Sequence, residues 1–168
     1  FAVESMIYRT TGLLDGALAD HGSADPTLLR QTLEELAVEC SILKVAGSEM
    51  LDYVLDENVQ IHGGNGFVKD YPAERHYRDA RVNRIFEGTN EINRLLIPSM
   101  LMKRAMKGRL NLMGAIATFE ERLATEDFSF PEDDLLAQTQ HAVELIKGLA
   151  LVTSAGVTQK YMDALEKE

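Results

Sequence analysis

Apolar residues recur at helical spacing along almost the whole chain, and this pattern restricts the possible folds more than any other feature of the sequence. In the first segment Val3, Met6, Ile7, Leu14 and Leu18 fall on one face of a helix. No run alternates apolar and polar residues in the manner of a half-buried strand. Because 45% of the residues are hydrophobic, the chain can bury a core. We therefore predict an all-α fold, an antiparallel helical bundle.

Turn-forming residues predict where the first helices begin and end. The first helix is expected to end near residues 20–22. Asp25 and Pro26 follow as the N-cap and the first residue of a second helix, because Asp caps free backbone N–H groups and Pro has none to offer. The apolar stripe then continues to Ile61, which predicts one helix about 50 Å long.

The middle of the chain contains two more predicted helices. After a glycine-rich stretch, the third is expected over residues 70–86, and the fourth starts with Thr89 or Asn90 as its cap. Pro98 lies inside the fourth helix and is expected to kink or break it, because proline lacks the backbone donor. Gly108 is expected to form the boundary at its end.

The last third of the chain predicts two further helices and a connector. The fifth helix is expected over residues 110–123, the connector over 125–134 and the last helix over 133–166. Gly148 and Gly156 are expected to weaken the last helix, because glycine loses more backbone freedom than alanine when a helix forms.

Charge and composition exclude several classes of function. The net charge is −10 and the pI is about 4.9, so a nucleic-acid site is not expected, because it requires clustered Lys and Arg. The single cysteine excludes an intramolecular disulfide and fits a reducing compartment. No apolar run reaches the roughly 20 residues that span a bilayer. No metal site is expected, because the histidines lack metal-ligand spacing: His21, His62, His76 and His141. Both ends look cut within helical patterns, which suggests a fragment of a longer protein.

Gly63, Gly64 and Gly66 form the first candidate binding element. Without Cβ atoms, the backbone can turn sharply and bring its N–H groups close to a ligand. The alternative is a helix C-cap followed by a plain turn, and taken alone the glycines favour that alternative. The spacing is not that of a dinucleotide-binding motif, and no strand precedes it.

Glu87 is the candidate catalytic residue. It is expected at the last turn of the third helix, between Phe86 and Gly88. The negative end of a helix and the apolar neighbours Ile85 and Phe86 both disfavour a charged carboxylate, which suits a general base acting near neutral pH. The alternative is a solvated turn glutamate, which the residue by itself would favour.

Taken together, these residues resemble the acyl-CoA dehydrogenase family. The matching stretches are residues 60–67 (QIHGGNGF), 71–72 (YP), 77–81 (YRDAR) and 85–92 (IFEGTNEI), in the order and spacing of the family. The resemblance covers residues 1–107. It implies most of the family's C-terminal helical bundle, without the first helix of that domain and without the N-terminal helical domain and the middle β-domain.

The resemblance also implies the roles of individual residues. Glu87 matches the base that removes the α-proton of a fatty acyl-CoA thioester, while FAD accepts the β-hydride at N5 and trans-2-enoyl-CoA is formed. Gly88 matches a backbone position beside the substrate. Two groups match contacts to FAD, the first across a subunit interface: Gln60, Ile61, His62, Gly63 and Gly64, and then Thr89, Asn90 and Glu91.

The segment at residues 108–168 resembles the extra helices of the very-long-chain subgroup, which implies long acyl chains. The family further implies an electron-transfer flavoprotein as electron acceptor, a homodimer or homotetramer, and a place in the bacterial cytoplasm or the mitochondrial matrix. The acidic tail argues against attraction to an anionic membrane. The chain alone is expected to be inactive. Two alternatives remain: a non-enzymatic helical module for dimerisation or docking, and a relative acting on another acyl-CoA or acyl-carrier substrate.

Overall fold

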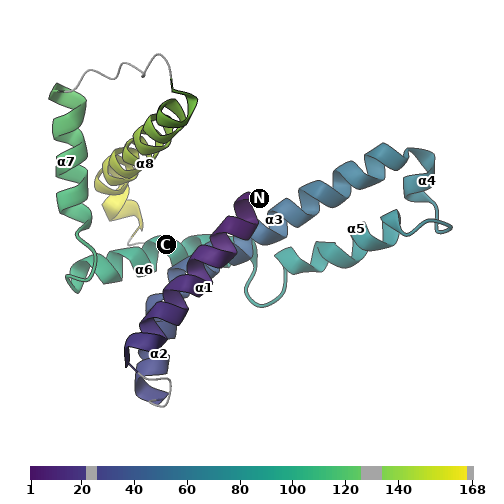
Figure 1. Ribbon diagram of the computed structural model, residues 1–168, viewed down its shortest axis with the longest axis horizontal. Helices are drawn as coiled ribbons and strands as arrows, with labels where there is room; N and C mark the ends of the chain where they lie inside the picture. Colours follow the sequence, from purple (N-terminus) through teal and green to yellow (C-terminus); the bar gives the residue numbers. More distant parts are fainter. Residues whose placement is uncertain (22–25, 126–133, 166–168) are drawn as a thin grey trace. The chain divides into compact units, whose positions relative to one another are not determined.

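The computed structural model describes residues 1–21, 26–125 and 134–165, and in these ranges it contains helices and no strand (Figure 1). The predicted all-α fold is confirmed. The chain divides into two units, Phe1–Lys103 and Arg104–Glu168. The helices are α1 (Ala2–His21), α2 (Pro26–Glu35), α3 (Ala37–His62), α4 (Gly64–Phe67), α5 (Ala73–Arg81), the 3₁₀ turn η1 (Val82–Arg84), α6 (Asn90–Met106), α7 (Leu112–Thr125) and α8 (Leu135–Leu165).

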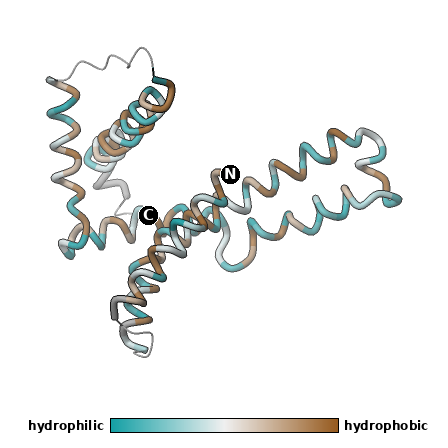
Figure 2. Tube along the Cα trace, in the orientation of Figure 1, coloured by the Kyte–Doolittle hydropathy of each residue, from teal (hydrophilic) through white to brown (hydrophobic). Residues whose placement is uncertain are grey.

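Helix α3 is the centre of the first unit. Helix α1 packs on α2 and α3, and α5 runs back along α3 on its way to η1 (Figure 1). Hydrophobic and hydrophilic positions are interspersed along α3 (Figure 2). Val38, Val45 and Ala73 are buried where these helices meet. The antiparallel pair α3–α5 places the segment after α5 beside the first half of α3.

The predicted 50 Å helix is wrong in one respect, because it is interrupted at Leu36. Its start at Pro26 and its end before Gly63 agree with the prediction, although Asp25 lies outside the described residues. The interruption is shallow: the Leu36 N–H donates to Thr32 O at 3.0 Å, and Leu36 O accepts from Cys40 N–H at 3.0 Å. Neither Gly nor Pro marks the position, so the apolar periodicity could not show it.

The glycines after α3 form a cap, as the favoured interpretation of the sequence predicted, followed by the short helix α4 instead of a plain turn. Gly63 has φ +55° and donates its N–H to Gln60 O at 3.1 Å, which ends α3. Gly66 is buried inside α4, and a Cβ there would lie 2.3 Å from the Val59 carbonyl oxygen. Gly66 is therefore needed for the close approach of α4 to the end of α3.

The third predicted helix is shorter than expected. Helix α5 ends at Arg81 and tightens into η1, which closes when Ile85 N–H donates to Val82 O at 2.8 Å. Glu87 consequently lies in a bend beyond the helical turn, and the expectation that it sits on the last turn is wrong. The periodicity of the segment continues past the point where the backbone leaves the helix, so the sequence overestimated its length.

Helix α6 begins and ends as predicted. Thr89 is its N-cap, because the Thr89 Oγ1 accepts the Ile92 N–H at 3.2 Å. At the other end Gly108 has φ +69° and donates its N–H to Ala105 O at 3.0 Å, an arrangement that glycine favours after a helix. Pro98 lies inside one continuous α-helix, so of the two predicted outcomes the break is wrong and the kink stays a prediction. Proline removes a single backbone donor there, and the neighbouring turns remain helical.

The second unit contains α7 packed on α8. Phe119 of α7 is buried, with 6% of its surface exposed, and lies against Gly148 of α8. A Cβ at Gly148 would fall on the Phe119 ring, so this glycine permits close packing and does not interrupt α8. A Cβ at Gly156 would meet nothing within 4 Å. The predicted connector over residues 125–134 falls almost entirely outside the described residues. Within the described ranges, no helix combines the length and apolar character that crossing a membrane requires.

Candidate active site

The turn between η1 and α6 adopts an unusual backbone conformation. Glu87 has φ +53° and is the one non-glycine residue with positive φ in the described ranges; Gly88 follows with φ +82°. A non-glycine residue in this region is strained by about 1–3 kcal/mol, and it remains there only when surrounding contacts hold it. These two successive residues with positive φ form a bend, and the Glu87 side chain is exposed there.

The carbonyl of Gly88 receives two hydrogen bonds that hold this turn. Lys44 Nζ, from α3, donates to Gly88 O at 2.7 Å. Asn93 Nδ2, from the first turn of α6, donates to the same oxygen at 2.9 Å and to Thr89 O at 3.0 Å. Both hydrogen bonds engage the Gly88 carbonyl within the chain, while the residue itself is exposed.

Asn90 fixes the start of α6 to α3. Its side chain is 1% exposed. Its Oδ1 accepts from Lys44 Nζ at 2.7 Å and from Ser48 Oγ at 3.3 Å, while its Nδ2 lies 2.9 Å from Ser48 Oγ and donates to Glu49 Oε1 at 3.2 Å. The Asn90 side chain has no surface to offer a ligand. We call Lys44, Ser48, Glu49 and Asn90 the α3–α6 polar cluster.

Two ion pairs flank the cluster. Arg94 of α6 lies 2.7 Å from Glu49 Oε1, and Arg84 of η1 lies 2.9 Å from Asp52 Oδ1. The hydrogen bond from Arg94 lowers the pKa of Glu49, with a smaller lowering from Asn90, and the same bond raises the pKa of Arg94. Both pairs join α3 to the chain on either side of the Glu87 turn, so the turn is anchored before and after Glu87.

The surroundings of Glu87 within this chain are less apolar than the sequence predicted. Ile85 is 54% exposed and Phe86 46% exposed, and Glu87 itself is exposed. The expectation that these neighbours desolvate the carboxylate is therefore wrong for the chain by itself. A carboxylate on an exposed, rigid turn requires another surface to remove water from it before it can act as a strong base.

The other residues of the turn cap α6. Besides the Thr89 cap, Glu91 lies in the first helical turn, exposed. A hydrogen bond from its own backbone N–H lowers the pKa of Glu91, and a bond from the Thr89 hydroxyl lowers it further. Thr89 and Glu91 thus remain near the surface, unlike Asn90.

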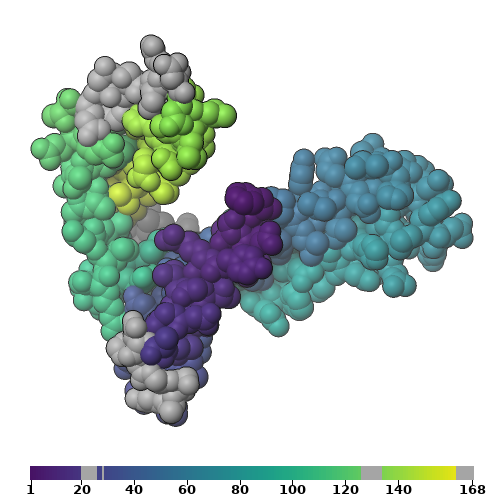
Figure 3. Space-filling model, in the orientation of Figure 1, coloured from purple at the N-terminus to yellow at the C-terminus, as the bar shows by residue number. Residues whose placement is uncertain are grey.

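The segment from Gln60 to Gly64 is held by local contacts. Gln60, His62 and the two glycines are exposed, and Ile61 is 81% exposed. His62 Nδ1 lies 2.8 Å from Asn58 O one turn earlier. In the space-filling view (Figure 3), α4 and the adjoining ends of α3 and α5 lie at the surface on the face shown. A Cβ at Gly63 or Gly64 would meet nothing within 4 Å, so their backbone is accessible.

The structure does not bring the two groups of predicted site residues together. Gln60 lies sixteen residues after Lys44 on α3, which is about 24 Å along the helix. The Glu87 turn is bonded to Lys44, whereas Gln60 to Gly64 lie at the far end of the same helix (Figure 1). Within one chain, these are two separate surfaces.

Sequence reasoning missed the α3 residues of the polar cluster. Lys44 and Ser48 are one helical turn apart, and Ser41 and Val45 share that face and are buried. Polar residues on the apolar face of a central helix were the available signal. Their partner in α6 could not be deduced from spacing, because Lys44 and Asn90 are 46 residues apart.

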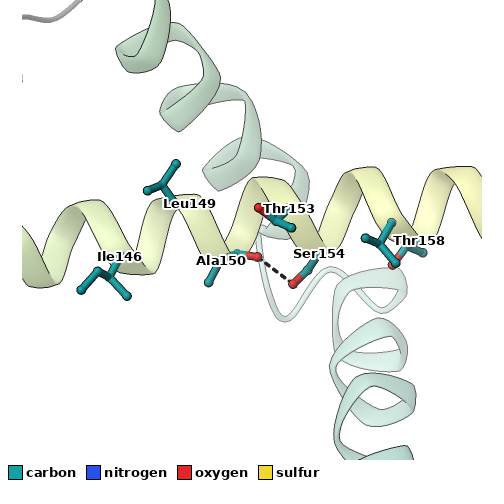
Figure 4. Close-up of a pocket in the computed structure, with 7 residues that line it drawn as sticks. Ile146, Leu149, Ala150, Thr153, Ser154 and Thr158 are labelled. Carbon is teal, nitrogen blue, oxygen red and sulfur yellow. Dashed lines mark hydrogen bonds between the residues drawn. The ribbon is translucent and has the colours of Figure 1, made fainter.

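A hollow in the second unit shares no residue with these surfaces (Figure 4). Its lining residues come from α8 alone and follow one face of that helix: Ile146, Leu149, Ala150, Thr153, Ser154, Val157 and Thr158. The Ser154 hydroxyl donates to Ala150 O at 2.7 Å and is thereby engaged by its own helix. In the part of the chain that the structure describes, no three His, Cys, Asp or Glu side chains gather in a group that could hold a metal ion.

The fold and the turn motif define the class of protein. Residues 17–102 match the family described as "Acyl-CoA dehydrogenase, C-terminal domain", and the chain belongs to the acyl-CoA dehydrogenase family. It is 44% identical over 171 residues to the probable acyl-CoA dehydrogenase of Bacillus subtilis (strain 168), a match that covers 100% of this chain and 29% of that protein.

Two further relatives extend the comparison. The crystal structure of an acyl-CoA dehydrogenase complexed with FAD from Bacillus anthracis superposes with a TM-score of 0.88 at 43% identity, covering 99% of this chain and 29% of that one. The mitochondrial short-chain specific acyl-CoA dehydrogenase of Bos taurus is 43% identical over 76 residues, 45% of this chain and 18% of that protein. The chain thus spans less than a third of the length of these relatives.

Proposed function

We propose that this chain is the C-terminal part of an FAD-dependent acyl-CoA dehydrogenase that converts a fatty acyl-CoA to the trans-2-enoyl-CoA. The observation that carries the proposal is the Glu87 turn. It presents an exposed carboxylate on a backbone held by Lys44, Asn93 and the buried Asn90. The family match over residues 17–102 includes this turn.

In this proposal Glu87 is the general base. The α-proton of a thioester is weakly acidic, so its removal requires a carboxylate that is aligned with the C–H bond and shielded from water. This chain supplies the alignment, because the turn is fixed to α3. The remainder of the enzyme and the acyl chain supply the shielding that Ile85 and Phe86 alone do not give. Gly88, whose carbonyl is occupied, faces the substrate with its N–H and Cα.

The exposed residues at the end of α3 fit a contact with FAD. We assign this contact to Gln60, Ile61, His62, Gly63 and Gly64, since the two glycines leave open space where a Cβ would stand. When bound, FAD supplies the acceptor for the β-hydride. Support for the cofactor comes from the Bacillus anthracis relative, which was crystallised with FAD.

Thr89 and Glu91 are assigned to a second contact with FAD, and Asn90 between them positions both by its bonds to α3. The two contacts lie about 24 Å apart along α3. We therefore propose that they serve different cofactor molecules in a homodimer or homotetramer, with Gln60 to Gly64 reaching the FAD of a neighbouring subunit.

The division of the chain and the substrate range are part of the same proposal. Residues 1–107 form the incomplete C-terminal bundle, and residues 108–168 form an additional helical segment. The proposed preference for long acyl chains rests on the resemblance of residues 108–168 to the extra helices of the very-long-chain subgroup. The reduced flavin would pass its electrons to an electron-transfer flavoprotein, in the bacterial cytoplasm or the mitochondrial matrix.

The test is the variant Glu87→Gln in the longer enzyme that carries this chain. Amide and carboxylate have the same shape, but the amide cannot accept the proton, so turnover of a long-chain acyl-CoA should fall by about 10³–10⁴-fold with FAD still bound. Dye reduction measures turnover, and flavin absorbance measures occupancy. Retained turnover would refute the base assignment. Binding of a partner protein by a longer chain that holds no flavin and turns over no acyl-CoA would favour the alternative, a non-enzymatic helical module.

A further inference from the structure

We propose that Lys44 is a positioning residue that sets the conformation of the Glu87–Gly88 turn from helix α3. Its ammonium group bonds Gly88 O and Asn90 Oδ1, both at 2.7 Å. The consequence for catalysis rests on the proposed function, whereas the consequence for the turn itself does not. Lys44 lies outside the four stretches that match the family motif, 43 residues before Glu87 in the sequence.

The strain in the turn shows why such a residue is needed. Glu87 at φ +53° is held in a region that L-residues avoid. Asn93 also donates to Gly88 O, but Asn93 lies in the first turn of α6, the helix that directly follows the turn. Its bond can therefore stabilise the local shape of the turn without fixing the turn relative to α3. Lys44 lies 44 residues before Gly88, on the central helix of the unit. Its bond therefore stabilises the local shape of the turn and also fixes the position of the turn relative to α3.

The chemistry of lysine suits the position. An ammonium group has three donors and no acceptor, and two of them bond a backbone carbonyl and a side-chain amide oxygen that point to the same place. Bonds from a charged donor are shorter and stronger than neutral ones, as the two 2.7 Å distances indicate. The half-buried Lys44 side chain passes along the face of α3 that carries buried Ser41 and Val45, so its stem is ordered by packing.

The variant Lys44→Met keeps the length of the side chain and removes the donors. In the 168-residue chain, ¹⁵N relaxation should show the amide order parameter of Gly88 falling from about 0.85 to below about 0.6. The matched control is Lys69→Met, an exposed lysine outside the turn and the cluster, which should leave Gly88 unchanged. Unchanged α3 resonances in the variant show that the fold persists. Lys44→Arg, which retains a charged donor, should restore the order parameter.

The same variants in the longer enzyme test the catalytic consequence. A misplaced base slows proton removal without weakening substrate binding, so Lys44→Met should lower kcat per bound flavin by at least about tenfold and change KM by less than about twofold. The kinetic isotope effect with α-deuterated acyl-CoA should rise, which a general loss of folded enzyme would not cause. Lys44→Arg should recover at least about half of kcat, and Lys69→Met should match the parent.

The outcomes separate this proposal from the proposed function. An order parameter at Gly88 that Lys44→Met does not lower overturns the positioning role, whatever the activity. A lowered order parameter with kcat per flavin unchanged overturns the catalytic consequence. If the parent enzyme turns over no acyl-CoA, the proposed function fails, and the relaxation measurement still decides whether Lys44 holds the turn.

Discussion

The Glu87 turn and the Gln60–Gly64 segment are joined by the same helix but are held in different ways. The turn is tied to α3 by contacts between residues more than 40 positions apart, through Lys44, Asn90 and the Glu49–Arg94 pair. The segment at the end of α3 is held by bonds spanning three or four residues, such as Gly63 N–H to Gln60 O.

This difference shows what each region can do in the absence of a ligand. Long-range bonds fix the direction of the turn before any substrate arrives, as a catalytic group requires. Local bonds fix only the shape of the Gln60–Gly64 segment and leave its surface exposed for whatever covers it. Ile61 is 81% exposed and Phe67 83% exposed, whereas Asn90 is almost fully buried.

The largest effect is expected from Asn90→Ala. This change removes a buried side chain that forms hydrogen bonds with Lys44, Ser48 and Glu49, so it should lower the free energy of unfolding by about 2–3 kcal/mol. Urea unfolding followed by far-ultraviolet circular dichroism measures it. The control is Asn65→Ala, an exposed asparagine of α4, with an expected change within about 0.5 kcal/mol. Equal effects of the two variants would remove the distinction between the regions.

Gly66→Ala is expected to have the next largest effect. It tests the close packing of α4 against the end of α3, next to the Gln60–Gly64 segment. The new Cβ would lie 2.3 Å from Val59 O and 3.0 Å from His62 Cβ, so α4 must move away from α3. We expect a loss of about 2 kcal/mol in the free energy of unfolding. Gly64→Ala is the matched control, because its Cβ meets open space. If Gly66→Ala proved as harmless as its control, the close approach would not contribute to stability.

Gly64→Val tests the open surface of the segment. The side chain has space in the chain itself, so the free energy of unfolding should change by less than about 0.5 kcal/mol. In the longer enzyme it should block the proposed approach of FAD to the backbone, and FAD affinity should fall about tenfold, or about 1.4 kcal/mol. Equilibrium flavin fluorescence measures the affinity. Gly12→Val on α1, also with open space, is the control; unchanged affinity in Gly64→Val would refute the assigned contact.

The smallest effect concerns the Glu49–Arg94 pair. Because its pKa is lowered on folding, Glu49 stabilises the fold fully at pH values above its unfolded pKa, and this stabilisation is lost as the pH falls through the folded value. The pair is partly exposed and screened, so Glu49→Gln should cost about 0.5 kcal/mol at neutral pH.

The difference in unfolding free energy between the parent and Glu49→Gln should shrink as the solution is acidified below the ordinary carboxyl range. Urea unfolding across a pH series measures it. Glu57→Gln, at an exposed position of the same helix, should show no such trend. A difference that is constant with pH would mean that the charge of Glu49 does not contribute through Arg94.

Local sequence signals predicted the helices and several of their ends. Pro26 starts α2, Thr89 caps α6 and Gly108 ends it, because each rule depends on atoms within a few residues. The break at Leu36 was not predicted, and of the kink or break predicted at Pro98 the break is absent. Position 36 is a leucine, and neither Gly nor Pro marks the break there. At Pro98 the loss of one backbone donor does not end the seventeen-residue helix α6.

The sequence by itself determined the all-α class, the family motif and the identity of Glu87 as the candidate base, because periodicity and motif spacing are written in neighbouring residues. The tertiary structure alone decided that Asn90 is buried, that Lys44 holds Gly88, and that Gln60 to Gly64 lie about 24 Å along α3 from the turn. These facts depend on which faces of distant helices meet. That outcome depends on packing between elements far apart in the sequence, and no short stretch of sequence contains it.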